Sequence, residues 1–87
     1  MTSIEASAAL VLPTDTGTAD VEIVVPVYNE ERDLAKGVRR LHAYLHDGFP
    51  FTTLITIADN ASSDDTWPIA QQLAGELSNV RAVHLAA

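Results

Sequence analysis

The feature that most constrains this chain is an alternation between short β-branched runs and segments with helical periodicity, which extends from residue 21 to residue 85. The runs VEIVV, FTTLITIA and VRAVHL predict strands over 21–25, 51–58 and 80–85, the first of them buried on both faces. Helical connections between them favour parallel strands and right-handed crossovers. We therefore expect an α/β fold in which β-α-β-α-β forms half of a doubly wound, Rossmann-like parallel sheet.

The first predicted helix has Asn29 as its N-cap and ends before Gly48. Its apolar stripe falls at steps of four, three and four residues: Leu34, Val38, Leu41 and Leu45. The second helix is expected over 66–78, with Trp67 packing near its start.

Length and composition limit the classes of protein to which this chain can belong. Its 87 residues make one small domain, or a piece of a larger one. We expect a disordered leader over 1–20, with a short edge strand there as the alternative, and a folded part over 21–87. The net charge of −7 argues against nucleic-acid binding, and no run of apolar residues is long enough to span a membrane. The absence of cysteine fits a reducing compartment such as the cytoplasm.

Two polar loops follow the first two predicted strands, at 26–30 and at 59–65. Ligands of open parallel sheets bind outside the carboxyl ends of the strands, where these loops should lie side by side. Neither loop contains the glycines that a phosphate cradle needs. Acidic side chains suit ribose hydroxyls, ring N–H groups of a base or a divalent cation, and Tyr28 could stack on a base. The loops thus indicate a nucleoside-shaped site.

Simpler interpretations exist for the same residues. Both loops could serve only as turns and helix caps, and Asp64 and Asp65 are expected to do so. His42 and His46 are one helical turn apart, but the sequence offers them no third metal ligand. We therefore predict no metal site in this chain.

The segments VEIVVPVYNEERDL and ITIADNASSDDTW resemble the start of a family 2 glycosyltransferase with the GT-A fold. The resemblance covers Val21 to about Leu85, and within the family it is greatest to the polyprenyl-phosphate sugar synthases of the dolichol-phosphate mannose synthase type. It implies a set of nucleotide-binding residues: Pro26, Tyr28, Glu30, Asp59 and Asn60. Asp59 would hydrogen-bond the base or ribose, and Asn60 would act as a neutral hydrogen-bonding group. Ser62, Asp64 and Thr66 would form turn hydrogen bonds and helix caps.

One position departs from the family pattern. Ala61 stands where the family has glycine, which argues against a tight left-handed turn at that point.

The resemblance implies transfer of a sugar from a UDP- or GDP-linked donor to an acceptor such as a polyprenyl phosphate, with inversion and with Mg²⁺ or Mn²⁺. Such an enzyme would work on the cytoplasmic side, at or near the membrane. The family's D-x-D motif and general base are not found in this sequence, so we name no catalytic residue and expect the chain alone to be inactive. A sheet that stops after the third strand would expose an edge open to self-association. The alternative is a non-catalytic nucleotide-binding or interaction α/β module.

Overall fold

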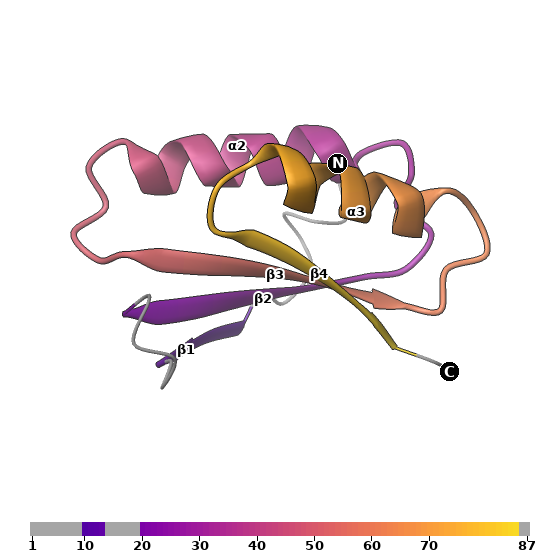
Figure 1. Cartoon of the computed structure of the whole chain (residues 1–87), viewed down its shortest axis with the longest axis horizontal. Helices are drawn as coiled ribbons and strands as arrows, with labels where there is room; N and C mark the ends of the chain where they lie inside the picture. Colours follow the sequence, from indigo (N-terminus) through magenta and orange to yellow (C-terminus); the bar gives the residue numbers. More distant parts are fainter. Residues whose placement is uncertain (1–9, 14–19, 86–87) are drawn as a thin grey trace.

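The computed structural model describes residues 10–13 and 20–85. Its elements follow in the order β1 (Leu10–Pro13), β2 (Val21–Val27), α2 (Leu34–His46), β3 (Thr53–Asn60), α3 (Thr66–Glu76) and β4 (Val80–Leu85). One sheet contains the four strands in the order β1-β2-β3-β4 (Figure 1). Because β2, β3 and β4 are parallel and are joined through α2 and α3, the predicted β-α-β-α-β fold is confirmed.

Both helices lie on the same face of the sheet, so the described chain has two layers (Figure 1). The connections from β2 to β3 and from β3 to β4 step in the same direction across the sheet. Right-handed crossovers that step in one direction place their helices on one face. The core therefore lies between this face and the helices.

The core is built from the expected helical stripes. Leu34, Val38 and Leu45 of α2 and Leu73 of α3 are buried against the apolar side chains of the strands. Leu41, the remaining member of the predicted stripe, is partly buried against the same cluster. Full burial of one such side chain stabilises the fold by roughly 1.5–3 kcal/mol. The 3.6-residue periodicity thus identified the buried face of α2 correctly.

The prediction that the first strand is buried on both faces is wrong. In β2, Ile23, Val25 and Val27 are buried, whereas Glu22, Val24 and Pro26 between them are partly or fully exposed. The reason is that the helices cover one face only. The central strand β3 differs, since every residue from Ile55 to Asp59 is buried.

The open face of the sheet carries a polar cluster across three strands. Thr56 of β3 donates a hydrogen bond to Glu22 Oε2 of β2, and Arg81 of β4 donates from Nε to Thr56 Oγ1 (2.9 Å). Arg81 Nη2 also lies 2.8 Å from Glu22 Oε2. The Thr56 hydrogen bond and Arg81 hold the pKa of Glu22 below its ordinary value of 4.5. This cluster gives the buried Thr56 hydroxyl partners on both sides.

Strands β2 and β3 each extend two residues beyond their predicted ends. Pro26 lies inside β2, paired in register with Ala58 of β3. Within the described residues, β1 pairs with β2 only as far as Val24, so the missing N–H of Pro26 falls where β3 is the one described strand beside β2. Asp59 and Asn60 belong to β3, whereas the sequence placed them in the following loop.

The predicted N-cap of the first helix is also wrong. α2 begins at Leu34 with Asp33 as its N-cap, and the backbone N–H groups of Asp33 and Leu34 donate to Glu30 O in a preceding turn. Asn29 has φ of 51°, in the left-handed region rather than the extended conformation of an N-cap. At the other end, Gly48 with φ of 101° follows the helix as expected. α3 ends at Glu76, two residues before the predicted end.

Within the predicted leader, Leu10–Pro13 forms β1 and pairs antiparallel with β2, which corresponds to the edge-strand alternative. Residues 1–9 and 14–19 lie outside the described residues, so the remainder of that prediction stays untested. In the part of the chain that the structure describes, neither helix is long and apolar enough to cross a membrane.

Candidate functional site

The two polar strand-end loops lie side by side, as the sequence predicted. The backbone N–H of Asn29, after β2, donates to Ser62 Oγ at 2.8 Å. In return, the backbone N–H of Ser63 donates to Asn29 Oδ1 at 2.9 Å. The Asn29 side chain therefore joins the two loops, which explains why it does not cap α2.

A second group of hydrogen bonds joins the start of the α2 turn to the start of α3. The backbone N–H of Glu30 donates to Thr66 Oγ1 at 2.7 Å. Glu31 donates from its N–H to Asp64 Oδ2 (3.3 Å) and accepts at Oε1 from the N–H of Asp65 (2.9 Å). The two loops thus form one hydrogen-bonded unit in which most polar atoms are used internally.

Asp64 serves the start of α3. Its Oδ1 accepts hydrogen bonds from the backbone N–H of Thr66 (2.9 Å) and from the Thr66 hydroxyl. Desolvation acts to raise the pKa of Asp64, but the hydrogen bonds from Thr66 and from the N–H of Glu31 outweigh it, and the pKa lies below its usual value. The proposed N-cap, Asp65, makes no capping hydrogen bond with its side chain. Asp64 therefore stabilises the turn.

Asp59 differs from these acids. It is the second-last residue of β3, on the face covered by the helices, and its side chain is 0% exposed. Ser62 donates its hydroxyl to Oδ1, whereas Oδ2 is buried and has no hydrogen-bond partner. A buried carboxylate oxygen without a donor is costly, because the protein has removed water from it without replacement. Among the described residues, Asp59 Oδ2 is the one buried side-chain oxygen or nitrogen without a hydrogen-bond partner.

Ala61 adopts the left-handed turn that its side chain was expected to prevent. Its φ is 55°, so the departure from glycine did not change the backbone, and that expectation is wrong. A left-handed alanine costs roughly 1–2 kcal/mol. The inter-loop hydrogen bonds at neighbouring Ser62 and Ser63 offset this cost.

The other predicted site residues surround the end of β2. Val27 pairs in register with Asp59, so Pro26 and Tyr28 flank the position beside the buried carboxyl group. Tyr28 is 58% exposed. Pro26 and Asn60 are also exposed, and Glu30 is partly buried. The structure therefore places Pro26, Tyr28, Glu30, Asp59 and Asn60 at one edge of the sheet.

Two further residues at this edge were not predicted as site residues from the sequence. His84 of β4 pairs in register with Asp59, and its Nε2 lies 3.4 Å from Asp59 Oδ2. Trp67, at the start of α3, stacks on the His84 ring with centroids 4.7 Å apart and an interplanar angle of 21°. Trp67 also packs against the core, which confirms its predicted packing role. Only the parallel register between β3 and β4 brings His84 to Asp59, and the sequence pattern did not give that register.

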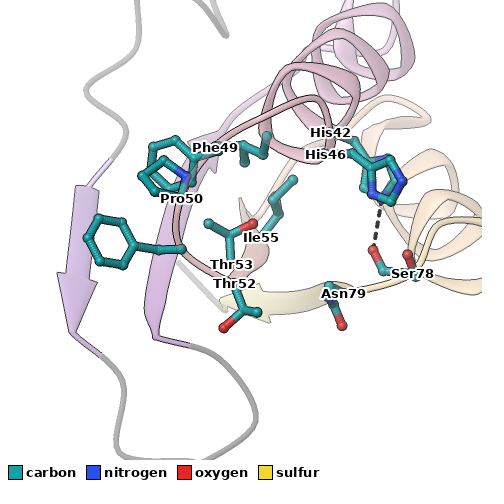
Figure 2. A pocket seen from close by; sticks show the side chains of 11 residues that line it. His42, His46, Phe49, Pro50, Thr52, Thr53, Ile55, Ser78 and Asn79 are labelled. Atoms are coloured by element: carbon teal, nitrogen blue, oxygen red, sulfur yellow. Dashed lines mark hydrogen bonds between the residues drawn. The ribbon is translucent and has the colours of Figure 1, made fainter.

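A cavity of about 270 Å³ lies at the opposite edge of the sheet, near the amino ends of β3 and β4 (Figure 2). Its wall includes the parallel rings of His42 and His46, whose centroids are 6.3 Å apart. His42 Nε2 lies 3.0 Å from the carbonyl oxygen of Ser78, which the dashed line in Figure 2 marks. None of the described residues that line this cavity belongs to the two loops, and Asp59 is not among them.

The described residues do not fit a divalent cation. Residues 10–13 and 20–85 contain no group of three or more His, Cys, Asp or Glu side chains placed to hold a metal ion. At the edge with the polar loops, the two oxygens of Asp64 already accept hydrogen bonds from Thr66 and Glu31.

The fold and the position of this edge define a Rossmann-like α/β protein whose polar residues gather at the carboxyl ends of parallel strands. The sequence matches the family model of glycosyl transferase family 2 over residues 22–87, and the chain belongs to that family. Members of the family generally use a nucleotide-sugar donor and a divalent metal. No curated protein and no solved structure matches the chain. The match supports the glycosyltransferase resemblance and leaves the polyprenyl-phosphate sugar synthase branch unassigned.

Proposed function

We propose that this chain binds the nucleoside part of a UDP- or GDP-linked sugar at the edge formed by Asp59, Tyr28 and the two polar loops. The observation that carries the proposal is the fully buried Asp59, whose Oδ2 has no hydrogen-bond donor. A site built to hydrogen-bond one group of a ligand leaves its own polar atom unpaired when the ligand is absent.

The chemistry of Asp59 narrows the choice of base. An ionised carboxylate can only accept hydrogen bonds. Uracil and guanine each present a ring N–H on the Watson–Crick edge, whereas cytosine and adenine present an unprotonated ring nitrogen there and donate only from an exocyclic amino group. Asp59 therefore favours uridine and guanosine, in agreement with a UDP- or GDP-linked donor. Ser62 fixes the carboxyl group through Oδ1 and leaves Oδ2 for the base.

The remaining residues have supporting roles in this proposal. Tyr28, exposed beside the position of Asp59, would stack on the base, and Asn60 would hydrogen-bond the ribose. Pro26 and Glu30 would form the wall on the side of β2. The family match supports a glycosyltransferase. We further propose that the enzyme transfers the sugar, with inversion and metal assistance, to an acceptor such as a polyprenyl phosphate at the cytoplasmic membrane face. This chain's described residues supply the donor-binding part and no metal site.

Titration with nucleosides tests the proposal without phosphate or metal. We expect amide NMR shifts around Tyr28 and Asp59 with uridine or guanosine, and none with cytidine or adenosine at equal concentration. Asp59→Asn keeps the shape and the acceptor for Ser62 but loses the charge, and should weaken uridine binding roughly tenfold, as expected for a hydrogen bond to a charged group. The matched control is Asp65→Asn, since Asp65 is exposed at the start of α3. Equal shifts with all four nucleosides would contradict the assignment.

One observation favours a second candidate, an interaction module that binds no nucleotide. The hydrogen bonds that join the loops use Asn29, Glu31, Asp64 and Thr66 for structure alone. If Asp59 also served only to hold Ser62, no nucleoside would bind and Asp59→Asn would change nothing except stability. A well-dispersed spectrum that no nucleoside alters, both in the wild type and in variants that uncover Asp59 Oδ2, would favour this second candidate.

A further inference from the structure

His84 lies where a ligand of Asp59 would have to be. The two residues are paired in register on adjacent parallel strands, and His84 Nε2 is 3.4 Å from Asp59 Oδ2. This separation is within ion-pair range, but the contact does not have the geometry of a hydrogen bond. Asp59 is 0% exposed, whereas the side chain of His84 is 47% exposed. A ligand can therefore reach Oδ2 only if a neighbouring side chain moves.

Of the neighbours of Asp59, His84 is the one best placed to move. Val27, the register partner on the other side, is buried in the core, and Ser62 is held by its hydrogen bonds to Asp59 and to the N–H of Asn29. β4 is the outermost strand of the described sheet next to β3, and His84 is the second-last residue of β4. Rotation of its half-exposed ring leaves the core intact.

The placement of the ring resembles that of a nucleobase. The imidazole is a planar aromatic ring that stacks on the indole of Trp67, with centroids 4.7 Å apart. One of its ring nitrogens faces the Asp59 carboxyl group, which we propose accepts a hydrogen bond from the ring N–H of uracil or guanine. Both contacts, the stacking on an aromatic face and the nitrogen facing a carboxylate, are those by which proteins bind bases.

We propose that His84 acts as a gate, in that its imidazole covers Asp59 Oδ2 in the ligand-free chain and must turn away before the base can bind. This inference rests on the proposed function. Among the described residues, the ring is in contact with Asp59 from β3 and with the uncharged indole of Trp67 from α3. A protonated imidazole pairs with Asp59 more strongly than a neutral one, so the gate is held more firmly at acidic pH. Nucleoside affinity is therefore expected to be higher when the imidazole is neutral than when it is protonated.

The test compares uridine affinity at pH 5.5 and pH 8 in the wild type and in variants of His84. We expect wild-type affinity to rise roughly tenfold between the two pH values, in line with the strength of hydrogen bonds to charged groups. His84→Ala should bind as tightly at pH 5.5 as at pH 8, and more tightly than the wild type at pH 5.5. His84→Gln keeps a neutral hydrogen-bond donor, so the pH dependence of uridine affinity should disappear. Because glutamine has no ring, it should pack on Trp67 less well than histidine does. His46→Ala, at the opposite edge of the sheet, should keep the wild-type pH profile.

The outcomes separate the two proposals. Binding that is independent of pH in the wild type, or weaker in His84→Ala than in the wild type at pH 5.5, would overturn the gate and leave the nucleoside site standing. Absence of uridine and guanosine binding in the wild type and in every variant at both pH values would overturn the proposed function, and the gate with it. Binding that is detected only after His84→Ala would support both.

Discussion

The backbone N–H of Glu30 donates a 2.7 Å hydrogen bond to the hydroxyl of Thr66, a residue 36 positions away along the chain. Thr66 is 0% exposed, and its hydroxyl also donates to Asp64. One buried hydroxyl thus fixes the end of the β2 loop against the start of α3. The candidate site depends on this contact because it sets the two loops side by side.

Replacement of Thr66 separates the role of its hydroxyl from that of its methyl group. Thr66→Val keeps the volume but leaves the Glu30 N–H without an acceptor, and should lower the free energy of unfolding by about 1–3 kcal/mol. Thr66→Ser keeps the hydroxyl and removes one methyl group, at a cost of about 0.8 kcal/mol. Urea denaturation measures both. If packing rather than hydrogen bonding dominated, valine would be the milder replacement and the prediction would fail.

Ala61→Gly should stabilise the fold. Ala61 has φ of 55°, a conformation that costs alanine roughly 1–2 kcal/mol and glycine almost nothing. The greater freedom of glycine in the unfolded chain removes part of this gain, so a net increase of about 0.5–1 kcal/mol is expected. Asn60→Gly is the matched control, because Asn60 is a strand residue without positive φ and should lose stability. Equal effects of the two substitutions would contradict the assigned backbone strain.

Acid should weaken the polar cluster on the open face of the sheet. The pKa of Glu22 is lowered by the Thr56 hydrogen bond and by Arg81. A carboxyl group with a lowered folded-state pKa contributes stability that is complete above its unfolded value and is lost as pH falls through the folded value. The loss from Glu22 should therefore begin below about pH 4.5, the ordinary value for glutamate.

Glu22→Gln tests this origin of the acid sensitivity. The variant should be less stable than the wild type at pH 7, and the two should converge as pH falls, because a protonated glutamate resembles glutamine. The midpoint of urea denaturation, measured between pH 7 and pH 3, gives both curves. Parallel curves with a constant offset would assign the effect to packing instead of charge.

The order of strands and helices could be predicted because each element carries its own periodicity. The stripe of Leu34, Val38 and Leu45 and the β-branched run of Ile23 to Val25 are local signals, and the structure confirms the elements that they predicted. One-sided burial of β2 could not be predicted in this way. It depends on the direction in which two crossovers step across the sheet, which no short segment encodes.

The site was predicted only in part, for a related reason. The sequence identified Asp59 and the two loops from their positions after strands, and the structure brings the loops together. It did not give the φ of Asn29 or Ala61, because bonds to residues more than 30 positions away hold the Asn29 loop in place. It also missed the contact of His84 with Asp59, which depends on the register of β4 against β3. Periodicity in the sequence predicts local elements, but it gives no information on contacts between distant segments.

Tyr28 provides the last prediction, which rests on the proposed nucleoside site. Its side chain is 58% exposed and lies next to Val27, the register partner of Asp59. Stacking of a base on an aromatic side chain contributes about 1–3 kcal/mol, so Tyr28→Ala should weaken uridine binding by roughly 5- to 150-fold. Tyr28→Phe keeps the ring and should bind as the wild type does, because stacking does not need the hydroxyl.

Tyr44 supplies the matched control for this experiment. It is 69% exposed on α2, so Tyr44→Ala removes an exposed tyrosine without altering the edge that holds Asp59. Neither alanine substitution should change the free energy of unfolding by more than about 0.5 kcal/mol, as is usual for exposed positions. Uridine titration by NMR then compares the two variants directly. An equal loss of affinity in both variants would mean that the effect is not specific to Tyr28. Unchanged affinity in Tyr28→Ala would show that Tyr28 does not contact the base, and the role of Asp59 would then be tested by Asp59→Asn alone.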